Sequence, residues 1–418
     1  MTRYARETRD DLEFVFRRAG VVEPEDTVAK LVPCVIRNES IFSRENERGG
    51  IQSSTFSTRL QDVDIAAATK AFNERLQERV VERLAAFPPD DHEVLSILDI
   101  NEAEYYLTQK KNKVIIVEVS RQPFALKASA SNKSAPFCHK MLNGILAWRC
   151  KGHWIMLPFM VHLTGALEQQ VRLHREWAEA AYSRMHIVPA VSIGDRAYDS
   201  SGFRGKQIKF RARFMHRVRT GEESNRWFVL EDGRKLRISE LCEQIALESL
   251  PVYADRMPKS RERFAYKVKN FKGRFQGDPT TVQLTLKVGI TPNGGTRKQP
   301  KWNWNPDTSM ALASDLFDLG AETLADLYLR RHRIEVFFQH FTNDRESLRP
   351  KTIQAFLLGY LTKVAVITGG QLARLETLLE ALQSGRLERA PKSWTVKRAI
   401  RDVVDAMAAM DPAPPPPD

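Results

Sequence analysis

Apolar residues at three- and four-residue spacing predict helices in both end regions of the chain. The stretch FSTRLQDVDIAAATKAFNERLQERVVERLAAF, which ends before Pro88, has this spacing, so we expect residues 1–90 to form a helical N-terminal unit. LARLETLLEALQSG predicts a second helical region at 371–410. The last segment, DPAPPPPD at 411–418, is rich in proline and is expected to be disordered.

Between these helical regions the pattern changes to short strands. KVIIVEV (113–119) is an almost continuous apolar run, which is typical of a strand buried on both faces. GILAWRC (144–150) and HWIMLPFMVHL (153–163) predict a hairpin, and residues 166–185 predict an amphipathic helix. A short apolar strand then ends at Asp195. This order of strands and a helix indicates a mixed α/β layer fold.

The pattern changes again near residue 203. RWFVLEDGRKLRIS carries an Asp232-Gly233 turn between two strands, TTVQLTLKVGI alternates like a half-buried strand, and TPNGGT predicts a turn after it. We therefore expect a β-rich insertion. The predicted units are 1–90 (helical), 94–202 (first part of the α/β domain), 203–305 (insertion), 306–370 (second part of the α/β domain), 371–410 (helical) and 411–418 (tail).

Composition indicates a polyanionic partner and a reducing compartment. The formal charge is +12, and the four cysteines form no CxxC pair, so a cytoplasmic protein is expected. The sequence has neither a run of 18 apolar residues nor an apolar signal region near Met1, so we expect no membrane partner. Two basic runs interleaved with aromatics, 204–219 and 259–274, are typical of nucleic-acid binding, although each alone also fits a solvated basic face. The DNA contacts expected from these runs are Arg204, Lys206, Lys209, Arg211, Arg213, Arg217, Lys267, Lys269 and Lys272.

Three acids are candidates for one site. In YLRRHRIEVFF, Tyr328, Arg331 and Glu335 fall on one helical stripe, which in isolation also fits a surface ion pair. Asp195 follows a strand, where α/β sheets bind ligands, and Glu118 lies inside an apolar strand, where an unpaired carboxylate is costly. Three carboxylates suit two Mg²⁺ or Mn²⁺ ions, which can drive phosphodiester chemistry.

Three stretches of the chain resemble the insertion-sequence transposases that carry a DDE site on a ribonuclease-H-like fold. SIGDRAY is similar to the segment of the second aspartate, ETLADLYLRRHRIEVFFQHF to the Y-x2-R-x3-E signature helix, and VIIVEVSRQPF to the strand of the first acid. The resemblance covers roughly residues 94–370 and includes a β-rich insertion between the second and third acids. It implies that 94–202 and 306–370 are two parts of one catalytic domain and that 1–90 is a DNA-binding unit. It implies that Glu118, Asp195 and Glu335 bind two metal ions and cleave DNA. It also implies that Tyr328 and Arg331 hold DNA near the cut.

The same resemblance implies cleavage and strand transfer of double-stranded DNA at element ends by a homodimer associated with the nucleoid. The sequence departs from the family pattern at three positions: Glu118 stands where an aspartate is usual, Thr342 where a lysine is usual, and His332 where a tryptophan is usual. Asp99, in SILDINE, is an alternative first acid. A catalytically decayed or repurposed DNA-binding protein of the same origin is therefore the alternative function, and a scaffold with a basic surface is a third.

Overall fold

A computed structural model of the 418-residue chain describes residues 2–37, 60, 62–90, 94–104, 126–127, 137–150, 153–164, 167–209, 213–218, 226–256, 263–296, 299–331, 353–385, 396–408 and 410. The chain divides into two compact units. The first unit comprises Met1–Pro89, Ile100–Met185 and Val336–Asp418, and the second comprises Asp90–Asp99 and His186–Glu335. Strand β1 (Val94–Glu104) passes from the second unit into the first. Helices and strands together confirm a mixed α/β fold.

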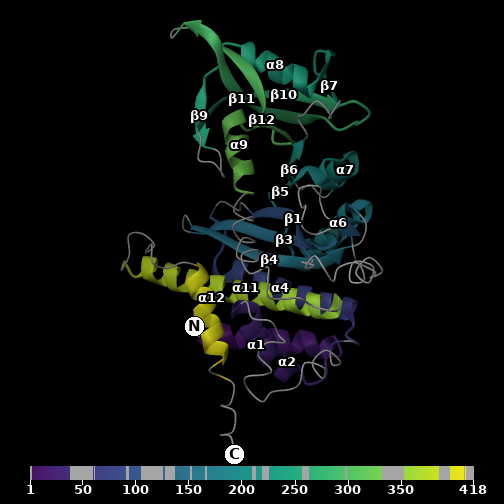
Figure 1. The fold of residues 1–418 in the computed structure, drawn as a ribbon, viewed down its shortest axis with the longest axis vertical. Coiled ribbons are helices and arrows are strands. Elements are labelled where there is room, and N and C mark those ends of the chain that lie inside the picture. Colours follow the sequence, from purple (N-terminus) through teal and green to yellow (C-terminus); the bar gives the residue numbers. More distant parts are fainter. Residues whose placement is uncertain are drawn as a thin grey trace, which may run out of the picture. The chain divides into compact units, whose positions relative to one another are not determined.

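The described residues of the first unit contain the helices α1 (Thr2–Arg18), α2 (Pro24–Arg37), α4 (Ile65–Ala86), α6 (Leu167–Arg184), α11 (Ile353–Gln383) and α12 (Val396–Ala408). The long helix α11 packs against α1, α2, α4 and α12, so the two end regions of the chain share one core (Figure 1). The helical character predicted for both end regions is confirmed, although the predicted stretch that starts at Phe56 becomes helical only at Ile65 among the described residues. Residues 1–90 share their core with the C-terminal helices and do not form a unit of their own.

The predicted hairpin of the first unit is confirmed. Strands β3 (Phe137–Cys150) and β4 (His153–Thr164) pair antiparallel, and the short β2 (Leu126–Lys127) pairs with β3. The side chain of Asn73 on α4 holds β4, because it donates to the carbonyl oxygen of Val161 at 3.0 Å and accepts from the same residue's N–H at 2.8 Å. These bonds satisfy backbone groups of β4 that would otherwise be open to another chain.

Helix α11 is also apolar enough to cross a membrane by length and composition. The candidate span Ile353–Ala381 has a mean hydropathy of 1.3, and 83% of it is buried inside the protein. Such burial is expected of a helix at the centre of a protein core. A helix in that position packs on all sides, which explains why α11 lacks a strongly polar face.

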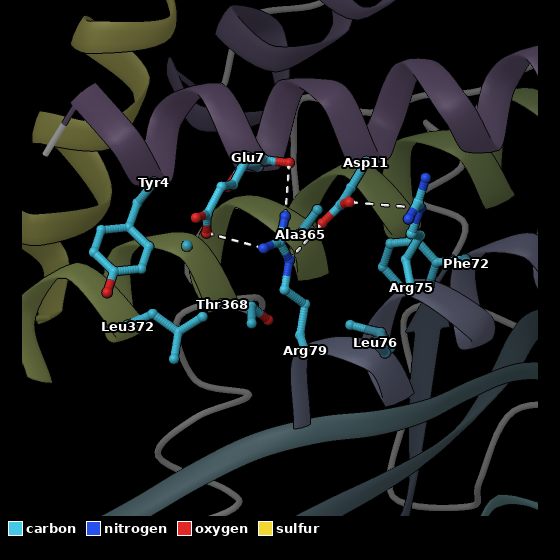
Figure 2. Close-up of a pocket in the computed structure, with 12 residues that line it drawn as sticks. Tyr4, Glu7, Asp11, Phe72, Arg75, Leu76, Arg79, Ala365, Thr368 and Leu372 are labelled. Atoms are coloured by element: carbon cyan, nitrogen blue, oxygen red, sulfur yellow. Dashed lines mark hydrogen bonds and ion pairs between the residues drawn. The ribbon is translucent and has the colours of Figure 1, made fainter. Parts of the chain in front are cut away.

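Oppositely charged rows on α1 and α4 face each other inside the first unit (Figure 2). Arg79 donates through Nε to Asp11 at 3.0 Å, and its Nη1 lies 3.0 Å from Glu7. Arg75 lies 3.7 Å from the other oxygen of Asp11 and stacks on Phe14, with its guanidinium carbon 4.1 Å from the ring centre. Burial raises the pKa of Asp11, and the two arginines oppose that rise. Because the acids and arginines recur four residues apart, their pairing favours one register between the two helices.

A cleft of about 900 Å³ lies between α4, α6 and β4, and a half-buried histidine, His162, lines it. The ring of His162 stacks on Trp177, with centroids 3.9 Å apart. Burial lowers the pKa of His162 to about 4, because the charged imidazolium loses its hydration there. Of the residues proposed from the sequence as DNA or metal contacts, none that the structure describes lines this cleft.

We expect His162 to make the first unit sensitive to mild acid. Its pKa is lower in the folded chain than in the unfolded one, so the stabilisation is complete above about pH 6.5 and decreases as the pH falls toward about 4. The full loss corresponds to roughly 3 kcal/mol. Urea unfolding at pH 7 and pH 4.5 should therefore show a smaller pH effect for His162→Phe than for the wild type. His186→Asn, at an exposed position with a φ of 53°, is the matched control and should leave the pH effect unchanged.

The second unit combines parallel and antiparallel strands. Strand β5 (Val191–Gly194) pairs in parallel with β1 on one side and with β6 (Arg213–Val218) on the other. Strand β12 (Gln299–Ser314) pairs antiparallel with β6 and with β11 (Val282–Thr296). The antiparallel order then continues through the other four strands, which are β10 (Arg263–Phe275), β7 (Trp227–Leu230), β8 (Lys235–Arg237) and, on β10, β9 (Tyr253–Arg256).

Two helices cover opposite faces of this antiparallel sheet. Lys267 of β10 donates to two carbonyl oxygens at the end of α8 (Ile238–Leu247), each at 2.6 Å. Asn270, which has the opposite side-chain direction on the same strand, donates at 3.2 Å to the carbonyl of Leu319, just before α9 (Ala321–Leu329). Figure 1 shows both helices beside β10, β11 and β12.

The predicted insertion is correct in its strands but not in its details. It contains α8, and its predicted start and end fall inside α7 (Ser201–Lys209) and inside β12. The predicted turn TPNGGT is wrong, because β11 continues to Thr296. The sheet register shifts there instead, and Gly294 has a φ of 79°, so these residues form an irregularity within the strand pair.

Candidate functional site

Two aspartates and an arginine lie at the ends of three neighbouring parallel strands in the second unit, one residue for each strand. The β1–β5 pairing extends to Leu98 and Gly194, and β5 pairs with β6 over the same length. The next residues are Asp99 on β1, Asp195 after β5 and Arg217 on β6. The carboxyl ends of parallel strands are where α/β sheets bind ligands, so these three side chains are placed at a favourable edge.

Arg331 joins the two aspartates. One of its nitrogens, Nη2, lies 3.2 Å from each carboxylate oxygen of Asp99 and 3.7 Å from Oδ2 of Asp195. The side chains of Asp99 and Arg331 are 16% and 12% exposed, whereas that of Asp195 is 38% exposed. Because a single nitrogen contacts both carboxylates, the two acids face the same point.

Within its described residues, the signature segment leaves the helix before Arg331. Helix α9 ends at Leu329, and the N–H of Arg331 donates to the carbonyl oxygen of Tyr328 at 2.9 Å, which is a turn contact. The prediction that Tyr328 and Arg331 lie on one helix is therefore wrong for Arg331. The turn nevertheless brings its guanidinium to the carboxylates.

Tyr328 lies beneath this charged group. Its side chain is 5% exposed, and its hydroxyl has no hydrogen-bond partner among the described residues. Burial raises the pKa of Tyr328, Asp195 and Asp99 add to the rise, and Arg331 and Arg217 oppose it. The hydroxyl thus lies within the field of all four charged side chains, and the buried ring supports the turn that carries Arg331.

A short 3₁₀ helix fixes the backbone that follows Asp195. Asp195 caps this helix, η1 (Arg196–Tyr198), and its carbonyl oxygen accepts from the N–H of Tyr198 at 2.9 Å. The ring of Tyr198 is buried against Gly194, where a Cβ atom would lie 2.8 Å from the tyrosine's own Cβ. Only glycine therefore allows the strand and the turn to approach this closely.

Asp199, at the end of that turn, is the centre of a buried ionic cluster. It accepts from Arg204 at 2.9 Å, from Nε2 of His216 at 3.1 Å, and from Arg226. Arg204 is 1% exposed and also donates through Nε to Asp278 at 2.8 Å. Burial acts to raise the pKa of Asp199, but the hydrogen bond and charge of His216, together with Arg226, outweigh it and hold the pKa well below the usual range. Sequence reasoning missed this cluster; the i, i+5 pair of an aspartate and an arginine after the strand was its only local signal.

We expect Gly194→Ala to disturb the site. The new methyl group would collide with Tyr198, so the turn carrying Asp195 must shift, at a cost of about 1–3 kcal/mol. Gly205→Ala, in α7, is the matched control. Nothing lies within 4 Å of its Cβ position, so this change should stabilise by roughly 0.5–1 kcal/mol. Urea unfolding of both variants measures the difference, and equal stabilities would contradict the proposed collision.

The donor set fits a hard divalent cation. Asp99 and Asp195 supply carboxylate oxygens, the preferred ligands of Mg²⁺ and Mn²⁺, and they already contact a positive group. Within the described part of the chain, no group of three or more His, Cys, Asp or Glu residues could hold a metal. Glu118 and Glu335, predicted as two of the three metal ligands, lie outside the described residues.

The predicted DNA contacts differ in their surroundings. Arg204 and Lys267 are buried and bonded inside the second unit, so neither side chain is presented to solvent. The structure places Arg217 half-buried next to the acids and Lys209 exposed at the end of α7. Arg213, Lys269 and Lys272 form ion pairs with Asp318, Glu248 and Glu231, while Arg211 and the side chain of Lys206 lie outside the described residues.

No protein-family model matches the chain, and no curated protein sequence is significantly similar to it. The side chains of the site are therefore the basis for assigning a function.

Proposed function

We propose that the protein is a DDE-type transposase that cleaves and rejoins DNA at the ends of its element. The observation that carries this proposal is the pair Asp99 and Asp195, placed on neighbouring parallel strands and contacted together by Arg331. Glu335, four residues after Arg331, supplies the third carboxylate in this proposal. Asp99 replaces Glu118 as the first acid, so an aspartate stands where the transposase pattern requires one.

The order of the strands supports a ribonuclease-H-like core for this activity. β1 has β3 as a neighbour on one side and runs parallel to β5 on the other, and β5 runs parallel to β6. A hairpin of β3 and β4 and helix α6 come between β1 and β5 in the chain. In such a core the acids at the ends of β1 and β5 face one active site, and the antiparallel strands after β6 correspond to the insertion.

Each side chain has a distinct task in the proposed reaction. Asp99 and Asp195 hold divalent cations, which when bound activate a water or a 3′-hydroxyl and stabilise the leaving oxygen. Arg217 lies next to the acids and is placed to bind the phosphate under attack, since a guanidinium can donate two hydrogen bonds to it. Tyr328 supports the turn beneath them from its buried position.

Charge supports DNA as the substrate. The chain carries a formal charge of +12, and a phosphate-binding protein releases counterions when it binds DNA, so its affinity falls as salt is added. Arg204 and Lys267 are excluded from the proposed DNA contacts because they are buried in bonds within the second unit. Lys209, which is exposed, and Arg217, which is half-buried, are kept as proposed DNA contacts.

The test is cleavage of a plasmid that carries the gene with its flanking DNA. The purified full-length protein should nick or cut this plasmid near the element ends with Mg²⁺ or Mn²⁺ and should leave it intact with EDTA. Salt-sensitive binding without any cleavage would refute the transposase and favour the repurposed DNA-binding protein. Absence of both binding and cleavage would refute both functions.

A further inference from the structure

Arg331 occupies the position that a divalent cation would need. Its Nη2 makes two contacts of 3.2 Å with Asp99 and one of 3.7 Å with Asp195. A guanidinium and a metal ion both use the carboxylate lone pairs that face the centre of the site, and their positive charges repel each other at this distance. Arg331 therefore competes with the metal for the two acids.

The arginine is also positioned so that it can leave. It follows the end of α9 and is anchored through its backbone N–H to Tyr328, so its side chain can rotate without unwinding the helix. Asp195 is 38% exposed, so the site is open to solvent on that side. A phosphate reaching this opening offers Arg331 a second anionic partner, which a guanidinium binds with two hydrogen bonds.

We infer that Arg331 couples DNA binding to metal binding: it neutralises Asp99 and Asp195 in the DNA-free protein and transfers to a DNA phosphate when DNA binds. This inference rests on the proposed function. The transfer frees the carboxylates for the divalent cation, so the metal site is completed only on DNA. By linkage, the metal must in turn raise the affinity for DNA by the same factor that DNA raises the affinity for metal.

The experiment measures Mn²⁺ affinity by electron paramagnetic resonance, with and without a duplex of element-end DNA whose integrity is checked on a gel. For the full-length wild type, DNA should raise Mn²⁺ affinity by about 5-fold or more. Arg331→Gln should bind Mn²⁺ about 5- to 10-fold more tightly than the wild type without DNA, and DNA should add little further. Arg196→Gln is the matched control, because it removes an exposed charge next to Asp195 and should retain the coupling.

The outcomes separate this inference from the proposed function. If Asp195→Asn binds Mn²⁺ as well as the wild type does, the acids hold no metal and the proposed function itself fails. If Asp195→Asn loses Mn²⁺ while Arg331→Gln behaves like the wild type, only the coupling is refuted. Equal wild-type Mn²⁺ affinity with and without DNA also refutes it, and that measurement needs no variant to fold.

Discussion

Asp99→Asn and Asp195→Asn are each expected to lower metal-dependent DNA cleavage by about a thousandfold or more, while DNA binding is largely retained. Each change removes one negative ligand from the point that Arg331 contacts, but it keeps the size of the side chain and the basic surface. In the proposed reaction, removing a ligand would weaken the binding of the cation that stabilises the transition state, and one tenfold loss in rate corresponds to about 1.4 kcal/mol. The measurement is single-turnover cleavage of the flanking DNA over a range of Mn²⁺ concentrations.

Glu118→Gln tests whether Asp99 or Glu118 is the first acid. If Asp99 is the first acid, Glu118→Gln should cleave at close to the wild-type rate, since Glu118 then has no part in holding metal. A thousandfold loss in Glu118→Gln together with normal cleavage by Asp99→Asn would overturn the assignment of the first acid and restore the one made from the sequence. Normal cleavage by Asp195→Asn would exclude this pair of carboxylates as the active site.

Asp199→Asn is expected to destabilise the second unit by about 1–3 kcal/mol, because the buried Arg204 loses one of its two charged acceptors and keeps only Asp278. Arg204 and His216 are 1% and 0% exposed, and both contact this carboxylate. Urea unfolding measures the loss, and hydrogen exchange of peptides from β5 and β6 locates it. Asp232→Asn is the matched control, since Asp232 forms an exposed pair with Arg234, and it should change stability far less than Asp199→Asn does.

The same carboxylate predicts the response of this unit to acid. The pKa of Asp199 is lower in the folded chain than in the unfolded one, so its stabilisation is complete above about pH 4 and is lost as the pH falls further. The wild type should therefore lose stability below about pH 4 more steeply than Asp199→Asn does. If the two proteins lose stability equally as the pH falls, or if they are equally stable at neutral pH, the charge of Asp199 does not stabilise the second unit.

The sequence by itself determined most of the elements and part of the site. Apolar spacing is a local property, so the N-terminal helices, the β3–β4 hairpin, α6 and the strand ending before Asp195 were all predicted from it. The short helix α8 was missed, although Ile238, Leu241, Cys242, Ile245 and Ala246 give it a buried face, because a helix of ten residues shows the helical spacing over only about three turns. Asp195 and Arg331 were identified because strand ends and motif spacing are visible in one dimension.

Only the tertiary structure showed that Asp99 lies beside Asp195. In the sequence Asp99 belongs to one of several apolar segments, and the strand that pairs with that segment cannot be read from it. Partner choice is non-local: the parallel register of β1 with β5 brings together residues that are 96 positions apart in the chain. For the same reason, the burial of Arg204 and Lys267 could not be read from the basic runs, since a charge run looks the same whether its side chains meet solvent or buried partners such as Asp278.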